Sequence, residues 1–172
     1  MQRHSVEAIV SALNAAQVRY LIAGGLAVVA HGYVRFTADL DMIVALDAEN
    51  VGRAVAALAA LGFRPRAPVP FDALADPAQR AAWVRDRQMT VFSVSSAAHP
   101  ATEVDIFVEA PLDFDEAYRR RASMQVSPGT AATFVSRDDL LQLKRAAGRP
   151  QDLADIDALG RLTAHPTNDQ TR

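Results

Sequence analysis

The sequence predicts a protein of the α/β (α+β) class, in which helices flank a mixed central β-sheet. Short, β-rich apolar segments alternate along the chain with longer segments whose apolar residues recur at helical spacing. Buried strands are expected at residues 20–23, where the apolar run stops at Gly24-Gly25, and at residues 40–44. Residues 102–108 alternate charged and apolar side chains, as a half-exposed strand does.

Composition limits the possible classes of protein. At 172 residues and 50% hydrophobic, the chain suits one compact domain, expected over residues 1–164, with a disordered tail at 165–172. A net charge of −2 excludes polyanion binding through bulk charge, although local patches can still bind. The absence of cysteine excludes disulfides and thiolate metal sites. No apolar run is long enough to span a membrane, so a cytoplasmic protein is expected.

The first elements of the chain lead to a glycine corner. Residues 5–17 predict a helix with Ser5 as its N-cap, packed on the sheet. Gly24-Gly25 then opens a second helix, which Gly32 ends. A glycine pair lets the backbone turn sharply and lets its N–H groups approach an anion, and phosphate is the natural guest.

Two aspartates follow this corner at a spacing that suits metal binding. Asp39 and Asp41 belong to the strand that continues through residues 40–44, and alternate residues of a strand point to the same face. Two carboxylates so placed can share divalent cations, which prefer oxygen ligands. An exposed, solvated strand face is the structural alternative.

The middle of the chain predicts ordinary packing elements. We expect a helix at residues 47–61 capped by Asp47, an edge segment at 63–66, and a surface loop at 68–77. Asp76-Pro77 starts a helix that runs to residue 87. Trp83 on this helix is expected in the core or an interface, and stacking on a base is the alternative. Residues 89–94 and 102–108 predict an antiparallel hairpin.

The C-terminal third carries most of the remaining cations. A helix at residues 114–122 ends in three arginines, which suit either a solvated helix end or a nucleic-acid contact. Strands are expected at 124–126 and 133–135. Ser136 caps a helix from whose far end Lys144, the only lysine, is expected to project. The last helix, residues 151–162, has Asp152 and Asp155 in its first turns, where the macrodipole favours acids. Arg149, just before this helix, is expected to pair with these acids or with phosphate.

A glycine pair followed by Asp-x-Asp between apolar neighbours resembles the DNA polymerase β-type nucleotidyltransferase superfamily. The longer string GGLAVVAHGYVRFTADLDMIV and the segment at residues 139–156 are similar to the AbiEii-like nucleotidyltransferases, which include toxins of type IV toxin–antitoxin systems. The resemblance covers roughly residues 20–44 and 103–160. It implies a nucleotidyltransferase fold and a third carboxylate on a neighbouring strand, for which Asp105 is the matching residue.

The resemblance also implies roles for individual residues. Asp39, Asp41 and Asp105 would hold two Mg²⁺ ions, and Gly24 and Gly25 would steady the phosphates of an NTP substrate.

Three further residues have expected roles in nucleotide binding. Arg35 and Thr37 match an Arg-x-Thr-x-Asp pattern; the alternative for Arg35 is a salt bridge to a nearby acid. Lys144 would pair with the leaving pyrophosphate, or is an ordinary helix-end lysine.

The acceptor is left open between three classes. The toxin-like resemblance and the arginines at 119–121, 145 and 149 favour an RNA 3′ end, with tRNA first. A small hydroxyl-bearing molecule, such as an aminoglycoside or lincosamide, is the enzymatic alternative. A catalytically idle fold that acts as a partner-binding or antitoxin module is the third. A cognate antitoxin or a homodimer is a possible partner.

Overall fold

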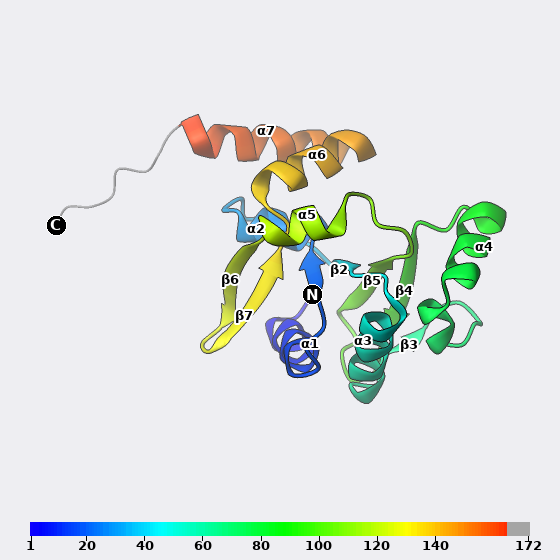
Figure 1. The fold of residues 1–172 in the computed structure, drawn as a ribbon. Coiled ribbons are helices and arrows are strands. Elements are labelled where there is room, and N and C mark those ends of the chain that lie inside the picture. Colours follow the sequence, from blue (N-terminus) through cyan, green and yellow to red (C-terminus); the bar gives the residue numbers. More distant parts are fainter. Residues whose placement is uncertain (165–172) are drawn as a thin grey trace.

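A computed structural model describes residues 1–164 and shows a seven-stranded mixed sheet with helices around it (Figure 1). The expected tail at residues 165–172 lies outside the described residues. The strands are β1 (Tyr20–Ile22), β2 (Asp39–Val44), β3 (Arg64–Pro65), β4 (Val91–Ser95), β5 (Glu103–Phe107), β6 (Ala122–Ser127) and β7 (Thr130–Phe134). The helices are α1 (Arg3–Ala15), α2 (Gly24–Ala30), α3 (Ala48–Ala60), the 3₁₀ turn η1 (Asp72–Ala75), α4 (Pro77–Arg87), α5 (Phe114–Arg119), α6 (Arg137–Ala147) and α7 (Pro150–Ala164). The predicted fold class is confirmed.

The strand order β3-β4-β5-β2-β1-β7-β6 puts the two functional segments of the sequence in the middle of the sheet. β2 runs parallel to β5 and antiparallel to β1, and β1 runs parallel to β7. β4 and β5 form the predicted antiparallel hairpin. Because β2 lies between β1 and β5, the glycine corner after β1 and the acids of β2 and β5 belong to three adjacent strands.

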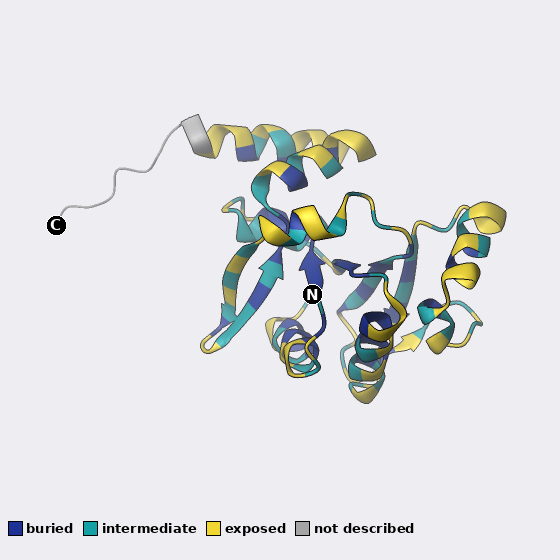
Figure 2. Cartoon of the chain, in the orientation of Figure 1, coloured by how far each residue is buried: buried dark blue, intermediate teal, exposed yellow. Residues whose placement is uncertain are grey.

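The core is built from the inward side chains of this sheet and of the helices packed on it. Every residue of β1 is buried (Figure 2). In β2, Leu40 and Met42 are fully buried, while Asp39, the first residue of the strand, is exposed. Trp83 is 3% exposed and stacks on Phe92, so the prediction that it lies in the core is confirmed. α6 and α7 pack together at the top of the view in Figure 1, beyond the strand ends that carry the glycine corner.

Several local predictions are confirmed by hydrogen bonds at helix ends. Asp47, Asp76 and Ser136 each accept a backbone N–H of the helix they precede. The prediction for Ser5 is wrong: α1 begins at Arg3, and the buried Ser5 hydroxyl lies 2.9 Å from Nδ1 of His99. A tertiary hydrogen bond therefore uses the group that a cap would use.

Several elements differ in length from their predicted ranges, and β6 and β7 for example are longer than the strands expected at 124–126 and 133–135. α5 ends at Arg119 and not at residue 122, because Ala122 already pairs with Phe134 as the first residue of β6. The surface loop at 68–77 contains the turn η1. Within residues 1–164, no helix combines the length and the apolar character that crossing a membrane requires.

Candidate active site

The glycine corner is shaped by the carboxylate of Asp41. Gly24 has φ +56°, and a Cβ at this position would overlap Oδ2 of Asp41 and lie 2.9 Å from its Cβ. The Ala23 N–H donates to the Asp41 carbonyl over 2.9 Å, which ties the corner to β2. Only glycine suits both the left-handed backbone and this close approach.

The second glycine has its own neighbours. A Cβ on Gly25 would overlap Oγ1 of Thr37 and lie 3.0 Å from Nη2 of Arg35. The loop that leads into β2 therefore packs directly against the start of α2. Both positions therefore require glycine, because Asp41 leaves no room for a Cβ at Gly24, and Thr37 leaves none at Gly25.

The three predicted acids share one face of the sheet. In the parallel register of β2 and β5, Asp41 lies opposite Asp105 and Asp39 lies opposite Glu103. Residues opposite each other in neighbouring strands point to the same side, as do alternate residues of one strand. Ser93 of β4 donates a 2.5 Å hydrogen bond to Oδ1 of Asp105. The expected position of Asp105 beside Asp41 is thus what the structure shows.

The charges of Asp41 and Asp105 are poorly compensated by their surroundings. Burial raises the pKa of Asp41, the nearby Asp105 and Asp39 raise it further, and hydrogen bonding from the Gly25 backbone and the charge of Arg149 only partly oppose the shift. Burial also raises the pKa of Asp105, against the hydrogen bond from Ser93. Desolvated carboxylates that repel one another are what a bound cation would stabilise.

The donor chemistry of the acids fits Mg²⁺. All three side chains offer hard oxygen ligands on one face, which Mg²⁺ prefers. Among the described residues, no group of three or more His, Asp or Glu side chains already has the arrangement of a metal-binding cluster. The carboxylates would have to draw together around an ion.

A cavity of about 440 Å³ lies over Asp41 and Asp105. Its lining also includes Gly24 and the polar residues Thr90, Lys144, Arg149 and Asp152, so the cavity joins the sheet to α6 and α7. Its apolar walls include Val91, Phe107, Pro111, Leu140 and Leu143. A cavity of this volume accommodates a nucleotide or a drug-sized molecule.

Lys144 lines this cavity, but the expectation that it projects from the far end of its helix is wrong, because its side chain is buried. Its side chain is 5% exposed, and Nζ lies 2.9 Å from Oδ1 of Asp152 and 2.7 Å from Oδ2 of Asp155. Both acids lie on the side of α7 that packs against α6. Burial alone raises the pKa of Asp155, but hydrogen bonds from Lys144, Gln151 and Arg35 outweigh it and hold the pKa below its ordinary value. A role for Lys144 toward a nucleotide stays a prediction.

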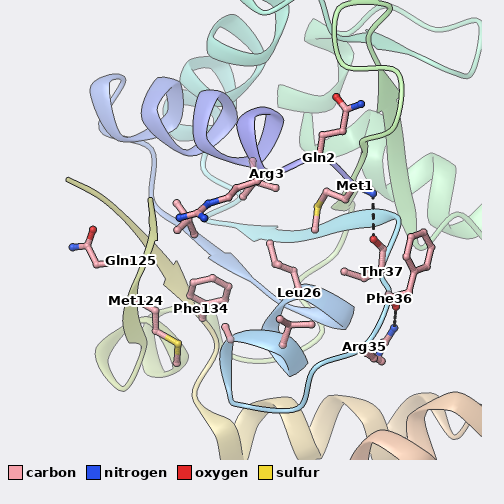
Figure 3. Close-up of a pocket in the computed structure, with 14 residues that line it drawn as sticks. Met1, Gln2, Arg3, Leu26, Arg35, Phe36, Thr37, Met124, Gln125 and Phe134 are labelled. Carbon is pink, nitrogen blue, oxygen red and sulfur yellow. Dashed lines mark hydrogen bonds between the residues drawn. The ribbon is translucent and has the colours of Figure 1, made fainter. Parts of the chain in front are cut away.

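Arg35 and Thr37 line a different cavity. Nη2 of Arg35 donates to Oδ2 of Asp155 over 3.0 Å, so the expected salt bridge is present. Both residues border a second space of about 440 Å³ between α1, α2 and the β6–β7 hairpin, where Leu26 and Phe134 form apolar walls (Figure 3). Of the predicted nucleotide-binding residues, only Gly24 and Lys144 line the cavity of Asp41.

One residue of the site, Ser93, was not predicted. Ser93 orients Asp105. The register of the β4–β5 hairpin could have identified this residue, because it places Ser93 directly opposite Asp105. Arg149 was expected to pair with neighbouring acids or with phosphate. It does pair with Asp152 over 2.9 Å, and it also lines the cavity of Asp41.

The arginine run at the end of α5 is used within the fold. Arg119 pairs with Glu116, and Nη2 of Arg120 lies 2.6 Å from Oδ1 of the buried Asp139. The Arg121 guanidinium lies 4.1 Å from the ring centroid of Tyr118. Each of the three has an intramolecular partner, which weakens the case for an RNA contact here.

Comparison with known proteins identifies the fold. No protein-family model and no curated protein sequence matches the chain. Among solved structures, the antibiotic-resistance factor ANT(2″)-Ia matches with a TM-score of 0.60 and 15% identity over 95% of this chain and 83% of that one.

Two further solved structures agree with this match. The same factor in complex with adenylyl-2″-tobramycin gives a TM-score of 0.56 and 16% identity, covering 95% of this chain and 88% of that one. The lincosamide antibiotic adenylyltransferase LnuA, with lincomycin bound, gives a TM-score of 0.55 and 13% identity, covering 86% of this chain and 89% of that one. The predicted nucleotidyltransferase fold is confirmed, and membership of the AbiEii-like family is not.

Gly24→Ala tests the close packing of the corner. The added methyl group overlaps Asp41 and the backbone is left-handed, so we expect a loss of at least about 2 kcal/mol in the free energy of unfolding. Gly52→Ala in α3 is the control, since a Cβ there meets nothing within 4 Å. This substitution should increase the free energy of unfolding by up to about 1 kcal/mol, because alanine favours a helix over glycine. Urea unfolding of both variants measures this; equal stability of the two would contradict the packing argument.

Asp41→Asn tests the uncompensated charge. Because the folded state raises the pKa of Asp41, the wild type loses stability as pH rises from about 4 through that raised value. The Asp41→Asn variant lacks this loss of stability. Its melting temperature should therefore exceed that of the wild type at pH values above the raised pKa, and approach the wild-type value at pH values below about 4.

Mg²⁺ provides the second arm of this experiment. It should raise the melting temperature of the wild type by about 2–4 °C for each kcal/mol of binding free energy, and leave Asp41→Asn unchanged. Thermal denaturation between pH 4 and 8, with and without Mg²⁺, gives both results. A variant less stable than the wild type at pH 8 would refute the charge argument.

Proposed function

We propose that this protein transfers a nucleoside monophosphate from an NTP to a hydroxyl group of a small molecule and releases pyrophosphate. The observation that carries the proposal is the pairing of Asp41 with Asp105 on one face of the sheet, against Gly24, in a cavity that also contains a cationic side. The nucleotidyltransferase fold supports it. Perturbed acids in a cavity are typical of functional sites.

Each residue has a defined part in the proposed reaction. Asp39, Asp41 and Asp105 would hold Mg²⁺, which when bound neutralises phosphate charge and polarises the reacting phosphorus. Asp105, oriented by Ser93, would accept the proton of the acceptor hydroxyl. The hydroxyl oxygen forms a bond to the α-phosphorus, and the bond to the bridging oxygen breaks as pyrophosphate leaves. Gly24 allows the phosphates to approach the backbone closely.

A small acceptor is better supported than an RNA 3′ end. Two of the matched structures contain small molecules, adenylyl-2″-tobramycin in one and lincomycin in the other. The arginines at 119–121, which favoured RNA in the sequence, pair with side chains of the fold. The net charge of −2 supplies no general attraction for polyanions. Hydroxyl-bearing compounds of the aminoglycoside or lincosamide kind are therefore the first acceptors to test.

A transfer assay tests this function. The purified protein is incubated with Mg²⁺, each α-³²P-labelled NTP, and either a panel of aminoglycosides and lincosamides or total tRNA. We expect label in a small molecule, and a loss of at least about 10²-fold in Asp41→Asn and Asp105→Asn, because each removes a charge that the transition state requires. Asp86→Asn is the control, since this exposed acid pairs only with the adjacent Arg85 among described residues.

The remaining outcomes of this assay are equally informative. Label in tRNA alone would show that the acceptor class is wrong. Label in neither, with no binding of Mg-NTP by the wild type, would leave an idle fold that serves as a partner-binding module.

A further inference from the structure

The cavity over Asp41 has two cationic residues in its lining, Lys144 and Arg149. A triphosphate carries several negative charges, so a site that binds one beside carboxylates needs a cation whose donors are accessible. The two residues differ in this respect. Their environments decide which one can serve.

Lys144 is already neutralised. Its side chain is 5% exposed, and its ammonium is within 3 Å of two carboxylates, at 2.9 Å from Asp152 and 2.7 Å from Asp155. Moving the ammonium to a phosphate would leave two buried acids with one partner fewer, which is costly. Lys144 is thus held as an internal counter-ion between α6 and α7.

Arg149 has the opposite environment. Its side chain is 77% exposed, and its hydrogen bond to Oδ2 of Asp152 uses only Nε. The guanidinium has five N–H donors, and among the described residues its terminal nitrogens have no hydrogen-bond partner. Arg149 also lines the same cavity as Asp41 and Asp105, the residues of the predicted metal site.

The charges of the surrounding network favour the same residue. Lys144, Arg35 and Arg149 face Asp152 and Asp155, and three cations against two acids leave one net positive charge. Arg149 is the most exposed member of this group, at 77% against 20% for Arg35 and 5% for Lys144. Arg149 is therefore the exposed cation of this group that lines the cavity.

We infer that Arg149, and not Lys144, is the residue that binds the β- and γ-phosphates of the nucleotide. Asp152 is its positioning residue: one oxygen holds Arg149 and the other is fixed by Lys144. A planar guanidinium can engage two phosphate oxygens at once. This inference rests on the proposed function, because it assigns the phosphate-binding group of the same site.

Calorimetric titration with two probes, inorganic tripolyphosphate and ATP, each with Mg²⁺, tests the inference on the full chain. Arg149→Gln should weaken binding of both probes about tenfold or more, as expected for losing charged hydrogen bonds. Arg149→Lys should recover part of the affinity, because it keeps the charge without the fork. Arg145→Gln is the matched control: this arginine is exposed on α6, outside the described lining of the cavity.

A double-mutant comparison tests the part given to Asp152. Asp152→Asn should weaken tripolyphosphate binding when it is introduced into the wild-type protein. The same substitution should have no further effect in the Arg149→Gln variant, because Asp152 acts through Arg149. Independent losses in the two backgrounds would show that Asp152 does not position Arg149. Circular dichroism of each variant verifies that it is folded at the temperature of the titration.

The outcomes separate this inference from the proposed function. If the wild type binds the probes and Arg149→Gln binds them as Arg145→Gln does, the inference is overturned and the proposed function stands. If the wild type binds neither probe, both are overturned.

Discussion

The structure depends on the close approach of the Asp41 carboxylate to the Gly24 backbone. This contact fixes where β1 ends and α2 begins, and it brings an acid of β2 to the point where the chain turns. The parallel pairing of β2 with β5 then adds Asp105 on the same face. The cost is a pair of desolvated, mutually repelling carboxylates in the centre of the sheet, which the fold alone does not require.

A second network of charges lies around α7, next to the same cavity. Its acids Asp152 and Asp155 collect Lys144, Arg35 and Arg149 from three different segments. The buried ion pairs connect α6, α7 and the loop before β2, so the cationic and anionic walls are held by one network. Buried ion pairs of this kind specify an arrangement more clearly than they add stability. Here the arrangement leaves one arginine open to the cavity.

Much of this could be predicted from sequence, because it is encoded locally. The caps at Asp47, Asp76 and Ser136, the glycine corner and the strand alternation around Asp41 depend on neighbours within a few residues. The environment of Lys144 does not: its partners lie eight and eleven positions away on another helix, and only the packing of α6 on α7 decides that it is buried. The same reason explains why Ser93 could not be predicted, since only the pairing of β4 with β5 brings it to Asp105.

One measurement tests the central claim most directly, namely that Asp41 and Asp105 form the metal-binding side of a nucleotide site. It is a crystal structure with Mn²⁺ and a non-hydrolysable ATP analogue, with the ion located by its anomalous signal. The account predicts an ion bound by oxygens of both aspartates and a triphosphate between Gly24 and Arg149. An ion elsewhere, or a nucleotide seated in the second cavity beside Leu26 and Phe134, would contradict it.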